Sequence, residues 1–216
     1  MTETENVFGT VFKVDPAPLG LTGFALTTFM LSFVNAGIIG SAGGTGMAIS
    51  FAFAYGGLAQ LIVVQWEMRR GSQFGFVAFS SYGAFWLWYV FLQIAAHFGI
   101  ITVTGQALGL SLIFWGILTL YLYVTAIRLN FALNMTFLFL WLAFFFLGAG
   151  AMTGSVILTH IGGYTGILAA VFAIYTAFAI VTNSNHSGRI PLGPGIGSKR
   201  QKEMVESKQS NTSLKN

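Results

Sequence analysis

Cysteine is absent from the 216 residues, so the fold contains no disulfide and no site that depends on a thiolate. Charge is also scarce: 7% of the residues are charged, against roughly a quarter in soluble globular proteins. Residues 16–66, 71–127 and 129–188 contain no Asp, Glu, Lys or Arg. Each stretch is much longer than the ~20 apolar residues that cross a bilayer once. The sequence therefore predicts an integral membrane protein.

The distribution of charge excludes several function classes. The net charge is +4, but the cations flank the apolar stretches or lie in the tail, which is typical of membrane topology and not of nucleic-acid binding. No charged residue lies at the centre of an expected span, which argues against a carboxylate-based proton pump and against a cation site. HExxH, GxSxG and Walker motifs are missing as well. We therefore predict no enzyme activity, no metal site and no cofactor.

Glycine, charged and polar clusters divide the apolar chain into six segments. We expect membrane-spanning helices near 19–40, 46–66, 76–96, 106–127, 131–154 and 162–182. The stretches 41–45 and 155–161 are expected to be short loops between them. The predicted fold class is all-α, a polytopic bundle of six transmembrane helices. Residues 1–14 form an N-terminal segment, 15–182 the six-span transport domain and 183–216 a polar tail.

The positive charges predict the orientation of this bundle. All ten Lys and Arg lie before the first span, between spans two and three, between spans four and five, or after span six. These positions share one side of the membrane when the number of spans is even. The positive-inside rule then places both termini in the cytoplasm. The tail 183–216 is rich in polar residues and is expected to be disordered.

Polar side chains within the spans are candidates for a substrate pathway, because burying them in lipid is unfavourable. Thr28 and Asn35 lie on one helical stripe, and Gln60 and Glu67 lie on another. The two amides are the better candidates, since an amide cannot satisfy all its hydrogen bonds within one helix. Thr28 and its neighbour Thr27 can instead bond their own helix backbone. Glu67 can form a local ion pair with the arginines that follow it.

The first span opens with the sequence DPAPLGL, residues 15–21. Asp is a favoured helix N-cap, and proline is well suited to the first turn of a helix. This pattern predicts that a helix starts between Asp15 and Leu19.

Longer blocks resemble a known family. DPAPLGLTGFALTT at 15–28 resembles the N-P-A-P-L-G-L signature of the acetate uptake transporter family, which includes bacterial succinate–acetate permeases and fungal acetate and ammonia-export-associated proteins. YGGLAQLIVVQWE at 55–67 and FGFVAFSSYGAFWL at 74–87 resemble the second and third spans of that family, and WGILTLYLY at 115–123 resembles the fourth. The resemblance extends over residues 15–182 and six spans.

The resemblance implies a site that composition alone does not. Family members have a narrow apolar constriction across the substrate pathway, which maps here to Phe24, Tyr82 and Leu140. Asn35, Gln60 and Glu67 also fall on family-like positions. The signature itself maps to Asp15, Pro16, Ala17, Pro18, Leu19, Gly20 and Leu21. Its first residue departs from the family, because Asp15 adds a negative charge near the pathway entrance where the signature has Asn.

These observations lead to a functional hypothesis with two alternatives. The resemblance implies a transporter or channel for acetate and other small monocarboxylates, with succinate as a further candidate substrate, linked to protons and located in the plasma membrane. It also implies a homo-hexamer in which each protomer has its own pathway. The alternatives are ammonia or ammonium export, for which no histidine lies in mid-span, and a non-transporting membrane sensor or scaffold that signals through its tail.

Overall fold

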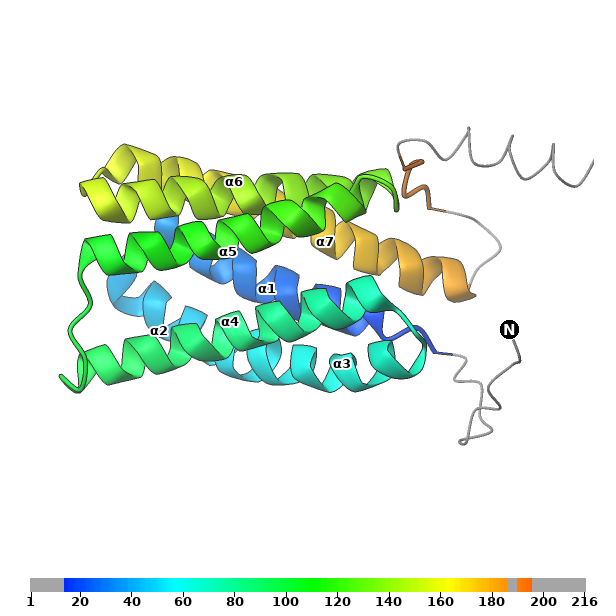
Figure 1. Ribbon diagram of the computed structural model, residues 1–216, viewed down its shortest axis with the longest axis horizontal. Helices are drawn as coiled ribbons and strands as arrows, with labels where there is room; N and C mark the ends of the chain where they lie inside the picture. Colours follow the sequence, from blue (N-terminus) through cyan, green and yellow to red (C-terminus); the bar gives the residue numbers. More distant parts are fainter. Residues whose placement is uncertain (1–13, 186–189, 196–216) are drawn as a thin grey trace, which may run out of the picture.

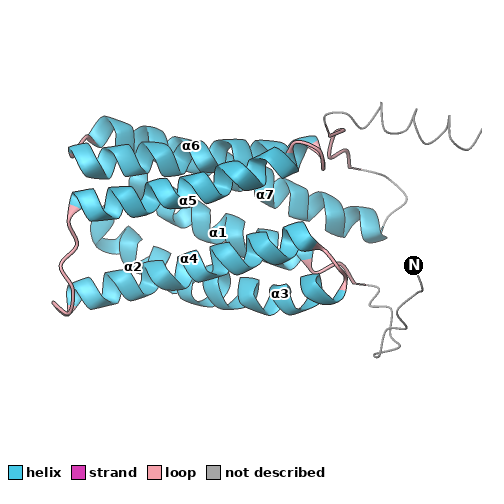
Figure 2. Ribbon diagram, in the orientation of Figure 1, coloured by secondary structure: helices cyan, strands magenta, loops and turns pink. Residues whose placement is uncertain are grey.

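The chain folds almost entirely into helices. A computed structural model describes residues 14–185 and 190–195. Within these ranges the one β-type pairing is an isolated bridge between Asn130 and Pro194. Figure 2 shows the helices and the short loops between them. The elements are α1 (Ala17–Asn35), α2 (Ser41–Phe51), the π-helix η1 (Ala52–Ala59), α3 (Gln60–Arg69), α4 (Gln73–His97), α5 (Gly105–Ala126), α6 (Phe131–Thr153) and α7 (Val156–Asn185).

The described chain contains six helical stretches that are long and apolar enough to span a membrane, as predicted. Five of them are single helices, namely α1, α4, α5, α6 and α7. The second span is a continuous helical stretch, Ser41–Arg69, made of α2, η1 and α3. The chain is therefore a multi-pass, all-α membrane protein.

Three predicted boundaries were wrong. The first span ends at Asn35 and not near Gly40, and the chain turns at Gly37, whose φ is +72°. Residues 41–45 are helical and open α2. Residues 156–161 are the first turns of α7, which begins after Gly154 ends α6 in the left-handed conformation. The error at 41–45 has a physical cause, since glycine interrupts helices in water but is common within helices in membranes.

The helices run side by side along the long axis of the molecule (Figure 1). Helix α6 packs along both α5 and α7, and α7 packs along α1. On the other side of α1, the π-helix η1 contacts α1 and α4, and α3 packs on α4. Helix α1 thus lies between the α5–α7 layer and the α2–α4 layer, where its side chains reach both (Figure 1).

The π-helix η1 was not predicted, and its packing explains why small residues occur there. A Cβ at Gly56 would lie 2.7 Å from the Trp86 ring, and one at Gly57 would lie 2.6 Å from the Leu87 side chain. These two glycines let the wider π-helix approach α4. Thr27 of α1 donates from its hydroxyl to the Gly23 carbonyl at 2.8 Å and lies 3.3 Å from the Phe51 carbonyl at the start of η1.

Part of the tail folds back on the bundle. We expected residues 183–216 to be disordered, but α7 continues to Asn185 and residues 190–195 pack against the start of α6. The N–H of Ala132 donates to the Leu192 carbonyl at 3.0 Å, and the Tyr175 hydroxyl donates to the Pro191 carbonyl. We call residues 190–195 the strap. The expectation for 186–189 and 196–216, and for segment 1–13, falls outside the described residues.

The strap makes a testable contribution to stability. Ala132 is 2% exposed, so removing its acceptor leaves a buried N–H unpaired, at a cost of about 1–3 kcal/mol. Deleting 190–216 is expected to lower the thermal unfolding midpoint in detergent, measured by intrinsic fluorescence. Deleting 196–216, which leaves the strap in place, is the matched control and should unfold like the full chain. Equal midpoints for the two truncations would contradict this role.

Candidate functional site

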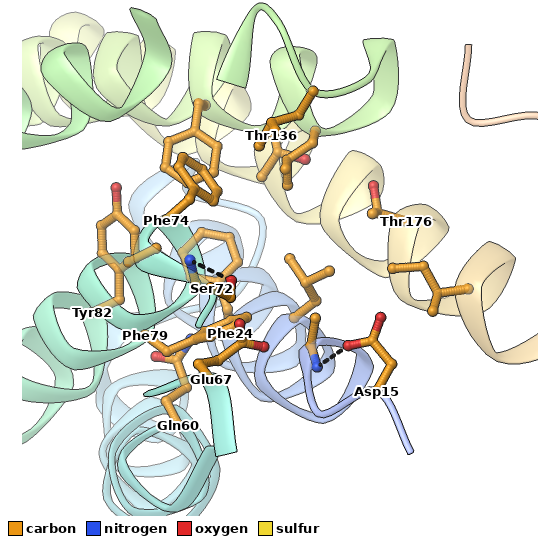
Figure 3. A pocket seen from close by; sticks show the side chains of 18 of the residues that line it. Asp15, Phe24, Gln60, Glu67, Ser72, Phe74, Phe79, Tyr82, Thr136 and Thr176 are labelled. Carbon is orange, nitrogen blue, oxygen red and sulfur yellow. Dashed lines mark hydrogen bonds between the residues drawn. The ribbon is translucent and has the colours of Figure 1, made fainter. Parts of the chain in front are cut away.

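Two cavities lie inside the bundle and share three side chains. The first, which we call the Glu67 cavity, has a volume of about 250 Å³ and is lined by α1, α3, α4, α6 and α7 (Figure 3). The second, the Asn35 cavity, has about 40 Å³ between α1, α4, α6 and α7. That is room for about three water molecules at roughly 10–15 Å³ each. The side chains that line both cavities are Phe24, Tyr82 and Leu140.

The three shared side chains are tightly packed. The rings of Phe24 and Tyr82 lie 5.6 Å apart between centroids, and Tyr82 lies 6.1 Å from Phe137. Phe24, Tyr82 and Leu140 are each at most 5% exposed. They come from three helices, α1, α4 and α6, which is why a short sequence window could not reveal their contact. The structure therefore brings together the residues that the resemblance assigned to a constriction.

The Tyr82 hydroxyl already donates its hydrogen bond within the protein. It donates to Thr119 Oγ1 on α5 at 3.0 Å, and Thr119 donates in turn to the Trp115 carbonyl at 2.7 Å. Thr119 is completely buried. The aromatic ring of Tyr82 thus lines the cavities while its hydroxyl fixes α4 to α5. Sequence reasoning missed Thr119, because nothing in a single helix marks it as the partner of a residue 37 positions away.

One end of the Glu67 cavity carries charge. Glu67 is completely buried, and its Oε2 accepts from Arg70 Nε at 3.1 Å. Arg70 also pairs with Asp15 at the start of α1. Gly75 of α4 makes the space for the carboxylate, since a Cβ there would overlap Glu67 Oε2. The local ion pair expected for Glu67 is present, and Glu67 Oε1 is left without a hydrogen-bond partner.

Gln60 occupies the wall of the same cavity. Its Nε2 donates to the Gly20 carbonyl at 3.1 Å, and its Oε1 is buried without a partner. A Cβ at Gly20 would lie 2.5 Å from the Phe79 ring, so the signature glycine lets α4 approach α1 at this level. The side chain of Gln60 therefore connects α3 to α1 and still offers its Oε1 as an acceptor.

The Asn35 cavity has a polar wall on α1. Thr28 and Asn35 line it, as their helical stripe predicted, together with Ser32, which sequence reasoning missed. The Thr28 hydroxyl is buried and has no hydrogen-bond partner. A Cβ at Gly166 would overlap the Ser32 hydroxyl, so α7 approaches α1 closely here. Ser32 follows Thr28 by one turn, which is the signal that could have identified it.

Other predicted residues have different positions. Thr27 is completely buried and bonds backbone carbonyls at the α1–η1 contact, so it lies outside both cavities. Asp15, which the sequence favoured as the N-cap, lies one residue before the observed cap Pro16, and its Oδ1 accepts from Ala17 N at 2.9 Å. The rest of the signature surrounds the charged end of the Glu67 cavity. Ala17 and Leu21 line that cavity, Pro16 and Leu19 line a neighbouring groove, and Pro18 and Gly20 are buried in the bundle.

Comparisons with known proteins agree with this fold. The model of the GPR1/FUN34/yaaH family matches residues 9–192. Acetate permease A of Emericella nidulans is 37% identical over 87% of this chain and 70% of its own. The succinate-acetate/proton symporter SatP of Escherichia coli is 32% identical over 86% of this chain and 98% of its own. The solved structure of the bacterial acetate channel SatP superposes with a TM-score of 0.79 at 33% identity, covering 83% and 99% of the two chains.

The contribution of the Tyr82–Thr119 hydrogen bond to the free energy of unfolding can be measured with variants at the two positions. Thr119→Val leaves a buried Tyr82 O–H without an acceptor, which is expected to lower the free energy of unfolding by about 1–3 kcal/mol. Tyr82→Phe should cost less, because Thr119 keeps its bond to the Trp115 carbonyl. Chemical unfolding in detergent measures both, and the double variant should resemble Tyr82→Phe alone. Additive losses would show that the two hydroxyls do not depend on each other.

Proposed function

The chain belongs to the GPR1/FUN34/yaaH family, and we propose that it is a transporter or channel for acetate and other small monocarboxylates. One observation supports this most: two cavities in a six-span bundle share the apolar side chains of Phe24, Tyr82 and Leu140. Relatives named acetate permease and succinate-acetate/proton symporter support the substrate class. Its relatives are transporters and channels, and we extend this to the absence of any enzyme activity.

The chemistry of a small carboxylic acid fits this arrangement. Its pKa is close to that of a side-chain carboxyl, ~4–4.5, so near neutral pH the anion predominates and only a small fraction of the acid is neutral. The neutral form crosses an apolar constriction at far lower free energy than the anion. On the Glu67 side, the unpaired oxygens of Gln60 and Glu67 can accept a hydrogen bond from the O–H of that neutral form. On the other side, Thr28, Ser32 and Asn35 supply donors for the carboxylate.

The proton then travels on the substrate. No charged residue occupies the middle of a span in the described chain, so the constriction itself offers no site to carry a proton. The proposal therefore includes proton-linked movement and, as the resemblance implies, a homo-hexamer in the plasma membrane with one pathway per protomer and both termini in the cytoplasm. Succinate is a further substrate to examine.

Transport by liposomes that contain the purified protein tests this proposal. We expect labelled acetate to enter faster than into empty liposomes and faster again with an inward proton gradient. Uptake that ignores the gradient but follows membrane voltage would contradict proton linkage and identify an anion channel. Absence of uptake would reject acetate transport and favour ammonium export or a sensor. Deleting 196–216 tests the sensor separately, because a transporter keeps its acetate flux with the strap intact.

The constriction has its own test. Leu140→Ala removes apolar volume where the two cavities meet and is expected to admit larger acids, so that lactate or succinate uptake rises relative to acetate. Leu120→Ala, at a side chain of α5 that is 38% exposed, makes the same change away from the cavities and serves as the control. Competition of unlabelled acids against labelled acetate measures the selectivity. Unchanged selectivity and rate in Leu140→Ala would mean that the constriction lies elsewhere.

A further inference from the structure

The charged end of the Glu67 cavity contains a group that the transport proposal has not used. We propose that Arg70 binds the carboxylate of the substrate at this end of the pathway, and that Asp15 is a built-in competitor which the substrate displaces. This inference rests on the proposed function and assigns a binding residue and a specificity-determining residue to it.

Arg70 is held in place by two carboxylates and has further N–H groups that can donate hydrogen bonds. Its guanidinium carries five N–H groups in a planar fork that matches the two oxygens of a carboxylate. Nε donates to Glu67, and the terminal nitrogen Nη1 donates to Asp15. These are the hydrogen bonds of Arg70 within the described residues, so the remaining N–H groups are available at the cavity that Arg70 lines.

The two carboxylates that bind Arg70 differ in their exposure to water. Glu67 is completely buried, whereas the side chains of Asp15 and Arg70 are 40% and 38% exposed. An ion pair between exposed side chains contributes little net stability, because water and salt compete for both charges. Glu67 therefore fixes the guanidinium in place, and Asp15 occupies the position that a free carboxylate can take over with little penalty.

The Asp15–Arg70 pair also separates two spaces. A groove of about 560 Å³ lies against the start of α1 and the end of α3, and its walls include Val14, Leu19 and Trp66. Asp15 and Arg70 are the side chains that line both this groove and the Glu67 cavity. Displacing Asp15 from Arg70 would therefore join the groove to the cavity, so binding of a carboxylate and opening of this end are one event.

The local charge explains why a competitor matters. Asp15 and Glu67 together outweigh Arg70 by one negative charge, which opposes the approach of an anion. The neighbouring Arg69 does not line the cavity, and its guanidinium lies 4.9 Å from the centre of the Trp66 ring. Asp15→Asn makes the three-residue cluster neutral. It also keeps the start of α1, since an Asn oxygen can still accept from Ala17 N.

The decisive experiment is a double-mutant cycle on acetate uptake by liposomes that contain the full chain. The variants are Asp15→Asn, Arg70→Gln and the two combined, with Arg69→Gln as the matched loss of a neighbouring positive charge. Because the chain has no cysteine, one cysteine appended after Asn216 reports the orientation through an impermeant maleimide. Initial rates are then measured against acetate concentration with the Arg70 side facing the acetate.

We expect Asp15→Asn to lower the half-saturating acetate concentration about fivefold, because the substrate no longer has to displace an ion pair of two unit charges at about 4 Å in water, with little change in maximal rate. Arg70→Gln should raise the half-saturating concentration, and adding Asp15→Asn to Arg70→Gln should not lower it again. Arg69→Gln should behave like the unmodified protein. If Arg70→Gln fails to fold, Arg70→Lys keeps the charge, loses the fork and should weaken the effect of Asp15→Asn.

Three outcomes would overturn the inference. Asp15→Asn without a change in half-saturation would show that Asp15 does not compete. If Asp15→Asn still lowers the half-saturating acetate concentration in the Arg70→Gln background, Asp15 acts only through its general electrostatic field. Equal effects of Arg69→Gln and Arg70→Gln would show that Arg70 has no special contact. Absence of acetate uptake by the unmodified protein is a separate result, which rejects the proposed function and this inference with it.

Discussion

The high free energy of an unpaired polar group in a membrane is the constraint on which this structure depends. Most polar side chains in the spans return their hydrogen bonds to the backbone of their own helix, as Thr136 and Thr176 do. The described residues contain six buried side-chain polar atoms without a partner. Four of them, on Thr28, Gln60, Glu67 and Trp86, belong to side chains that line one of the two cavities, and the other two are on Asn134 and Trp141. Unmet hydrogen-bonding capacity is therefore concentrated where a solute could satisfy it.

Close approach between helices positions these groups. Gly20 admits the Phe79 ring against α1, Gly75 admits the Glu67 carboxylate against α4, and Gly166 admits Ser32 against α7. Each of these glycines lies beside a cavity-lining side chain and has little to do with turns. In lipid, where burial of apolar surface does not drive helices together, such contacts supply the packing that fixes the site. The strap adds backbone hydrogen bonds at the start of α6, the helix that contributes Leu140.

The sequence was sufficient for those features that depend on one helix. The charge-free stretches, divided at glycine, charged and polar clusters, predicted the six spans. The 3.6-residue period correctly placed Thr28 and Asn35 on one wall of the Asn35 cavity. Features that depend on two helices were beyond it: the Asp15–Arg70 pair joins residues 55 positions apart, and the Tyr82–Thr119 bond crosses from α4 to α5. The helical position of Thr27 alone does not show whether it faces a cavity or η1. The grouping of Phe24, Tyr82 and Leu140 came from the family resemblance and not from periodicity.

The two shared boundaries of the Glu67 cavity impose opposite demands on a carboxylic acid. Arg70 at one end favours the anion, because a guanidinium binds the ionised carboxylate most strongly. The packed side chains of Phe24, Tyr82 and Leu140 at the other end favour the neutral acid. Under the proposed function, a substrate that satisfies both gains or loses its proton between them, exchanging it with water within the 250 Å³ of this cavity. The unpaired oxygens of Gln60 and Glu67 lie in that interval, where they can accept the new O–H and so favour protonation before the apolar boundary is reached. In the proposed function, proton linkage results from the order of the two boundaries and needs no charged residue in the middle of the membrane.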